Sequence, residues 1–240
     1  MRVPRPCPAR RMTLVAGDSV AMARYGRGSS PEDLAAAVRR AGVSDGRVLA
    51  AIAATPRTAF VPPAYARVAY EDRPLPIPHG QVTTQPSLSA MMIAGLGLAD
   101  GEQVLEIGTG YGYQAALLAR LAGQVVSIEI WPDMAAQARR NLAAQGITNV
   151  LVVAGDGTEG YLARAPYDAV LVSAACTEVP PPLVAQLRPG GRLVQPIGPG
   201  GHEEVLVFER RAESLRPVRV LTSASFVPLH GKHGLPLAET

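Results

Sequence analysis

A strand-like segment that runs into a glycine-rich turn and then a helix is the feature that most restricts the fold of this chain. The apolar run 103-QVLEI-107 leads directly into 108-GTGYGYQ-114, and the helical pattern 113-YQAALLARLA-122 follows at once. Strand, glycine turn and helix in this order form the first crossover of Rossmann-type sheets, where the turn approaches a bound ligand. The sequence therefore predicts an α/β fold with a ligand site at this turn.

The chain after residue 87 supports a doubly wound sheet. Apolar runs recur without polar alternation, as strands covered on both faces require. The predicted strands are 103–107, 125–130, 150–153, 168–173, 192–197, 204–209 and 218–221. Helical patterns at 113–122 and 132–145 separate the first three, and each is followed by a glycine. Right-handed crossovers then give a Rossmann-like, mostly parallel seven-stranded sheet, and the last two strands, with no helix between them, form an antiparallel edge hairpin.

Residues 30–86 have a different pattern from the sheet region. Two short helices are expected between 30 and 55, the first capped by Ser30 with Pro31 at its first position. From Pro56 to residue 86 the chain is rich in proline and has no lasting period, which predicts a long ordered loop. Long loops inside compact domains are usually functional. We therefore expect this one to contact the substrate.

Charge is unevenly distributed along the chain. Residues 1–30 carry six Arg and one acid, although the net charge of all 240 residues is only +3. We interpret 1–29 as a disordered basic leader rather than a nucleic-acid-binding arm, because no aromatic residues are interleaved with the arginines. With 48% hydrophobic residues, 30–240 can bury the core of a single domain. Within it, 30–86 holds the N-terminal helices and substrate loop, and 87–240 the ligand-binding core and C-terminal strands.

The apolar runs are too short to span a bilayer, and the first residues lack the apolar segment of a secretory signal. The two cysteines, Cys7 and Cys176, are too far apart to indicate a disulfide framework or a zinc site. We therefore expect a cytoplasmic protein without membrane, nucleic-acid or metal partners.

Three acidic residues fall at the carboxyl ends of predicted strands, where ligands of such sheets bind. Glu106 lies at the end of the first strand, Glu129 ends the second, 19 residues after Gly110, and Asp156 follows the third. Glu129 is placed to accept hydrogen bonds from a ribose diol, Asp156 from an adenine amine, and Glu106 to reach an ammonium group. Three acids converging on one crevice are difficult to explain as solvated turn residues.

The glycine turn narrows the class of ligand. Gly108 and Gly110 would let the backbone approach a ligand closely, and the following helix start offers unpaired N–H groups to an anion. Tyr113 stands where the third glycine of a dinucleotide fingerprint belongs. A nicotinamide cofactor is therefore disfavoured. In a methyl donor the anion would be a methionine carboxylate.

Five segments together resemble protein-L-isoaspartate O-methyltransferases. They are 73-RPLPIPHGQVTTQPSLSAMM-92, 104-VLEIGTGYGYQAALLARL-121, 155-GDGTEGY-161, 166-PYDAVLVSAA-175 and 183-LVAQLRPGGRLVQPIGPGG-201, and the likeness covers roughly residues 45–231. The resemblance implies methyl transfer from S-adenosylmethionine to the α-carboxylate of L-isoaspartyl residues in proteins or peptides. The methyl ester then forms a succinimide, which begins repair.

The resemblance also implies the site residues. The family has an active-site Ser in a Gly-Gln-Thr-Ile-Ser-Gln-Pro type loop, and 80-GQVTTQP-86 places Thr84 on that Ser. Thr84 is therefore the expected catalytic residue, its hydroxyl orienting the substrate carboxylate. The expected substrate-binding residues are Gln81, Thr83, Thr84 and Gln85. The expected cofactor-binding residues are Glu106, Gly108, Thr109, Gly110, Glu129, Ile130, Asp156 and Gly157.

A carboxylate is ionised at pH 7, so its methylation needs no general base, metal or catalytic triad. His79, just before the loop motif, is accordingly interpreted as a solvated loop residue. Three alternatives stay open: methylation of ordinary Asp in a ribosomally made peptide, a nucleotide-binding oxidoreductase module, and a nucleic-acid methyltransferase. The last lacks its Asn-Pro-Pro-Tyr type motif, because the chain reads 173-SAACTEVPPP-182 there.

Overall fold

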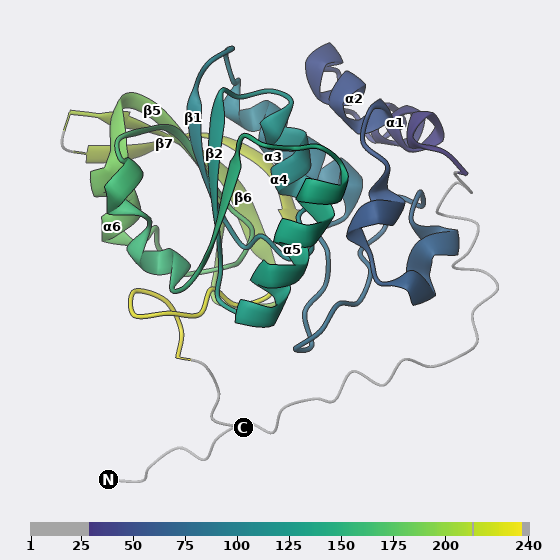
Figure 1. The fold of residues 1–240 in the computed structure, drawn as a ribbon. Helices are drawn as coiled ribbons and strands as arrows, with labels where there is room; N and C mark the ends of the chain where they lie inside the picture. Colours follow the sequence, from purple (N-terminus) through teal and green to yellow (C-terminus); the bar gives the residue numbers. More distant parts are fainter. Residues whose placement is uncertain (1–28, 213, 237–240) are drawn as a thin grey trace, which may run out of the picture.

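In residues 29–212 and 214–236, which the computed structural model describes, seven strands form one sheet in the order β3-β2-β1-β4-β5-β6-β7 (Figure 1). The strands are β1 (Gln103–Ile107), β2 (Gln124–Glu129), β3 (Val150–Ala154), β4 (Tyr167–Val172), β5 (Leu187–Ile197), β6 (Glu203–Arg211) and β7 (Ser214–Ala224). The pairs from β3 to β5 are parallel, and β6 runs antiparallel to both β5 and β7. The predicted doubly wound sheet with an antiparallel edge hairpin is confirmed.

Helices cover both faces of the sheet. They are α1 (Pro31–Arg40), α2 (Gly46–Ala53), α3 (Pro86–Leu96), α4 (Tyr113–Ala119), α5 (Pro132–Ala144) and α6 (Pro181–Gln186), with 3-10 helices η2 (Arg57–Phe60), η3 (Pro63–Val68), η4 (Gly157–Glu159) and η5 (Leu162–Arg164). Figure 1 shows α3, α4 and α5 on one side of the sheet and α6 on the other. Side chains of β1 and β4 alternate between the two cores: Val104 and Leu171 pack with the helices of α1 to α5, and Leu105 and Val170 pack with α6. This two-sided burial explains the continuous apolar runs.

Local signals place the first helices where the sequence predicts them. The Ser30 side chain accepts a hydrogen bond from the Asp33 N–H, and α1 begins at Pro31. Asp45 caps α2 in the same way. The expected long loop differs from the prediction, because η2 and η3 lie within it. Its short runs between prolines are long enough for single 3-10 turns.

A short segment after β7 returns to the end of β4. The Ala175 N–H donates to the Val227 carbonyl at 2.8 Å, and the Leu229 N–H donates to the Ala175 carbonyl at 2.7 Å. The C-terminal segment therefore lies beside the carboxyl ends of the parallel strands. This is the edge at which ligands of doubly wound sheets bind.

The expected basic leader lies outside the described residues, apart from Ser29. Within the described ranges, no helix is long and apolar enough to cross a membrane.

Candidate active site

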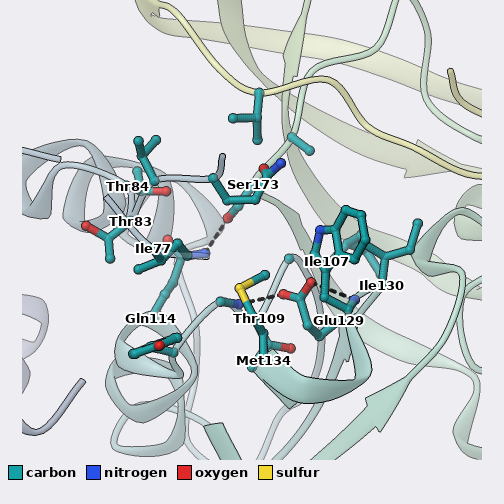
Figure 2. A pocket seen from close by; sticks show the side chains of 18 of the residues that line it. Ile77, Thr83, Thr84, Ile107, Thr109, Gln114, Glu129, Ile130, Met134 and Ser173 are labelled. Atoms are coloured by element: carbon teal, nitrogen blue, oxygen red, sulfur yellow. Dashed lines mark hydrogen bonds between the residues drawn. The ribbon is translucent and has the colours of Figure 1, made fainter. Parts of the chain in front are cut away.

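A cavity opens at the carboxyl ends of β1, β2 and β4 (Figure 2). Its wall combines three parts of the chain: the strand ends with their following turns, the loop around residues 77–84, and the C-terminal segment 227–230. The lining residues that the sequence also predicted are Gln81, Thr83, Thr84, Gly108, Thr109, Gly110, Glu129, Ile130 and Gly157. The predicted ligand site and the predicted substrate loop therefore face one cavity.

Glu129, the last residue of β2, lines this cavity. Its Oε2 accepts a hydrogen bond from the Gly110 N–H at 2.7 Å, and its Oε1 accepts one from the Trp131 N–H at 3.1 Å (Figure 2). Burial raises the pKa of the Glu129 carboxyl, and the two backbone donors oppose that rise. A carboxylate has about four acceptor positions. Two backbone bonds therefore leave acceptor capacity for hydroxyl groups of a ligand.

The glycine turn lies close to its neighbours. Gly108 and Gly110 have φ angles of 96° and 55°, which side chains rarely tolerate. A Cβ atom on Gly108 would lie 3.4 Å from the Ser173 side chain, and one on Gly110 would lie 3.5 Å from Ile77. Both neighbours line the cavity. These distances are ordinary van der Waals contacts, so the positive φ angles are what favour glycine at both positions.

Glu106 is not among the residues that line the cavity. It is fully buried, and its Oε2 accepts a hydrogen bond from Ser127, which is in turn bonded to the lining residue Thr109 at 2.6 Å. Burial raises the pKa of Glu106 to about 8. At neutral pH most of this carboxyl is therefore protonated. Its expected role toward a ligand ammonium stays a prediction.

Both carboxylate oxygens of Asp156 accept hydrogen bonds from other residues of the chain, and Asp156 is also not among the residues that line the cavity. Its Oδ1 accepts hydrogen bonds from the N–H and hydroxyl of Thr158, and its Oδ2 accepts one from the Lys232 N–H at 2.7 Å. The carboxylate thus ties the C-terminal segment to the turn after β3. Only its neighbour Gly157 lines the cavity. The expected contact between Asp156 and adenine stays a prediction.

The two threonines of the loop have different environments. The Thr83 hydroxyl accepts hydrogen bonds at 3.0 Å from the Arg57 guanidinium and from the Leu75 N–H. For the Thr84 hydroxyl we find no hydrogen-bond partner in the described part of the chain, and Figure 2 shows its oxygen on the side facing Ser173. Thr83 therefore braces the loop, whereas the Thr84 hydroxyl is available to a ligand.

Arg57 anchors the loop from inside. It is fully buried, and its guanidinium donates at 3.0 Å to the carbonyls of Ala69, Glu71 and Arg73 as well as to Thr83. Burial lowers the pKa of Arg57 to about 10, which leaves it charged at neutral pH. One charged side chain therefore satisfies three backbone carbonyls of a segment that has little secondary structure.

Gln85 and His79 differ from their expected surroundings. The Gln85 amide donates to Asp72 and Ser87, so Gln85 braces the start of α3 and does not line the cavity. His79 is partly exposed, as expected of a loop residue, but its ring is stacked on Trp131. The contacts of Gln85 with Asp72 and of His79 with Trp131 have no local sequence signal, because each joins residues far apart along the chain.

Several lining residues were missed by the sequence analysis. They include Phe60, Ile77, Gln114, Met134, Ser173 and the C-terminal residues Val227, Pro228, Leu229 and His230. Gln114 donates to the Ser173 hydroxyl at 2.6 Å across the end of β4 (Figure 2). Ser173 could have been found, since it is the last residue of the fourth predicted strand, at the ligand-binding edge. Among the described residues, no group of His, Cys, Asp and Glu side chains could hold a metal ion.

Comparisons with known proteins agree on one family. Residues 29–234 match the family model described as protein-L-isoaspartate(D-aspartate) O-methyltransferase. A protein-L-isoaspartate O-methyltransferase of Methanoculleus marisnigri is 51% identical over 197 residues, which are 82% of this chain and 89% of the relative. One of Anaeromyxobacter dehalogenans is 53% identical over 190 residues, which are 78% of this chain and 91% of the relative.

Solved structures show the same fold. A protein-L-isoaspartate O-methyltransferase with 32% sequence identity has a TM-score of 0.75 and matches 85% of this chain and 67% of its own. A putative Plasmodium falciparum protein of the same description, in complex with S-adenosyl-L-homocysteine, has a TM-score of 0.75 at 20% identity, over 85% of this chain and 99% of its own. At that identity the second likeness concerns the fold alone.

Proposed function

The chain belongs to the protein-L-isoaspartate(D-aspartate) O-methyltransferase family, and on that basis we propose which residues carry out its S-adenosylmethionine-dependent reaction. It transfers a methyl group to the carboxylate of L-isoaspartyl residues in proteins or peptides. The resulting methyl ester then forms a succinimide in a non-enzymatic step, with release of methanol. Succinimide formation begins the repair. A cytoplasmic location and the absence of nucleic-acid, membrane and metal partners remain predictions from the sequence.

One observation supports the residue assignment most strongly. Glu129 and Thr84 line the same cavity from different parts of the chain: Glu129 accepts two backbone N–H bonds, and the Thr84 hydroxyl has no hydrogen-bond partner among the described residues. Glu129 accepts hydrogen bonds from the ribose hydroxyls of the cofactor. Thr84 donates from Oγ1 to the substrate carboxylate. The cavity thus has a hydrogen-bond acceptor for S-adenosylmethionine and a hydrogen-bond donor for the substrate carboxylate.

The chemistry requires position more than acid–base assistance. S-adenosylmethionine, when bound, supplies an electrophilic sulfonium methyl group. The substrate carboxylate is already ionised at neutral pH, so no residue has to remove a proton. Alignment of the carboxylate oxygen with the methyl group can contribute several kcal/mol through effective concentration. Apolar lining residues such as Ile77, Ile130 and Met134 help to exclude water from that geometry.

Thr84→Val tests this assignment, because valine keeps the shape of the side chain and removes its hydroxyl. We expect kcat/KM for an isoaspartyl peptide to fall about ten- to hundredfold, equivalent to about 1.5 to 3 kcal/mol for a lost hydrogen bond to a charged group. Thr84→Ser should stay active, and affinity for S-adenosylhomocysteine should change little. The assay is radiolabelled methyl transfer to matched peptides containing isoaspartate, aspartate or neither.

Thr83→Val is the matched control, since it removes a hydroxyl from the adjacent residue. It should lower the free energy of unfolding by about 1 to 2 kcal/mol, because Arg57 and the Leu75 N–H lose an acceptor. Its effect on kcat/KM should be smaller than that of Thr84→Val. Wild-type methyl transfer in Thr84→Val would contradict the role of Thr84. Methylation of the aspartyl peptide in preference to the isoaspartyl peptide would contradict the substrate.

A further inference from the structure

Residues 76–82 form a small hairpin at the rim of the cavity. Pro76 and Val82 pair as an antiparallel bridge, and the Gln81 N–H donates to the Pro78 carbonyl at 3.2 Å. The two central residues of this turn, His79 and Gly80, both have positive φ angles, 59° and 66°. Two positive φ angles define a type I′ turn, for which Asn-Gly is the favoured pair. His79 therefore occupies a position that Asn would fill with less strain.

The side chain of His79 joins this hairpin to the start of α5. Its ring lies parallel to that of Trp131, with 4.0 Å between ring centroids and 3° between the planes. Its Nε2 lies 2.9 Å and 3.0 Å from the two carboxylate oxygens of Asp133. The hydrogen bond from His79 lowers the pKa of Asp133. We call His79, Trp131 and Asp133 the His79 cluster.

The His79 cluster connects the two sides of the candidate active site. On the proposed cofactor side, Trp131 lines the cavity, and its backbone N–H donates to Glu129. On the substrate side, Ile77 and Gln81, which flank the turn, also line the cavity. His79 itself is not among the lining residues. Its contacts therefore act on the cavity only through the residues that it holds together.

We propose that His79 is a positioning residue: by stacking on Trp131 and pairing with Asp133, it holds the hairpin 76–82 against the start of α5 and fixes the separation of the substrate and cofactor sides. The inference rests on the proposed function for what the cavity binds. Histidine tolerates a positive φ angle, but Asn-Gly is the favoured pair in this turn, so the ring contacts with Trp131 and Asp133 are what distinguish histidine here. The stack on Trp131 and the hydrogen bond to Asp133 hold the turn in place at this positive φ angle.

His79→Asn tests the proposal, since Asn retains the turn and removes the ring. We expect kcat/KM for the isoaspartyl peptide to fall about five- to tenfold, the size expected for losing an aromatic stack and an exposed hydrogen bond together. The melting temperature should stay unchanged or rise. His202→Asn, at an exposed histidine between β5 and β6, is the matched control and should keep wild-type kinetics. Wild-type kcat/KM in His79→Asn would overturn the proposal.

Trp131 variants separate the stack from the direct contact of Trp131 with the cavity. Trp131→Phe should retain most activity, because a phenyl ring can still stack on His79. Trp131→Leu should lose activity, and the double variant with His79→Asn should be at least about threefold more active than independent effects predict. Independent effects of the two substitutions would overturn the proposal.

Binding of S-adenosylhomocysteine distinguishes this inference from the proposed function. His79→Asn should weaken the calorimetric affinity about threefold, since Trp131 loses its support. If the wild-type chain methylated no isoaspartyl peptide, the proposed function would fail. The positioning role of His79 would then be tested by comparing the S-adenosylhomocysteine affinity of His79→Asn with that of wild type. Unchanged affinity in that case would overturn the inference as well.

Discussion

The two sides of the cavity are built in different ways. The cofactor side, residues 107–111 and 128–131, continues directly from β1 and β2, whose parallel register pairs Ile107 with Ile128. The proposed substrate side, residues 77–84, is a small hairpin with an isolated bridge between Pro76 and Val82, and side chains such as Arg57 hold it against the rest of the chain. Strand pairing thus places the first, and a buried arginine with a few long-range contacts places the second. Substitutions on the two sides should therefore have separable effects.

Arg57→Leu should break the substrate side and have the largest effect. Three loop carbonyls would lose a charged donor, so we expect the free energy of unfolding to fall by about 3 to 6 kcal/mol. Denaturant titration measures this loss. In the fraction that stays folded, methyl transfer should fall far more than affinity for S-adenosylhomocysteine. Equal losses of both would show that the two sides are not separable, and Arg57→Lys should recover part of the stability.

Glu106→Gln tests the buried hydrogen bonds that join Glu106 to Ser127 and Ser127 to the lining residue Thr109. Burial raises the folded-state pKa of Glu106 from its ordinary value of 4.5 to about 8. Between these pH values the folded state holds a proton that the unfolded state has released, so wild-type stability falls as pH rises. Gln cannot titrate. As the pH rises from 5 to 8, the free energy of unfolding of the variant should therefore increase by about 1 to 4 kcal/mol relative to that of wild type. Urea unfolding at both pH values checks this, and parallel pH curves would contradict it.

Glu129→Ala should have a smaller effect, confined to the cofactor side. Loss of hydrogen bonds from ribose hydroxyls to a charged acceptor should weaken binding of S-adenosylhomocysteine by about 1.5 to 3 kcal/mol, measured by calorimetry. The KM for the isoaspartyl peptide at saturating cofactor should change little, because the substrate side is held by Arg57 and His79. Unchanged cofactor affinity would remove Glu129 from the site.

Local patterns in the sequence predicted the sheet and the cofactor side. Apolar runs, glycine turns and helix caps depend on residues a few positions apart, so β1, the turn at Gly108 and the cap at Ser30 could be identified without a structure. The rule that ligands bind at the carboxyl ends of parallel strands then predicted a ligand contact for Glu129, which lines the cavity in the structure. On this side the fold follows from short-range chemistry.

The tertiary structure alone decided the remaining contacts. Thr83 and Thr84 are adjacent and chemically identical, but the Thr83 hydroxyl is bonded by Arg57, 26 residues before it, and by the Leu75 N–H, whereas Thr84 lines the cavity. Asp156 bonds the Lys232 N–H, 76 residues away, and His79 meets Asp133, 54 residues away. Such contacts form only when the folded chain brings distant segments together. Hydrophobic periodicity carries no information about them, because it reports which face of an element is buried and not which side chain meets it there.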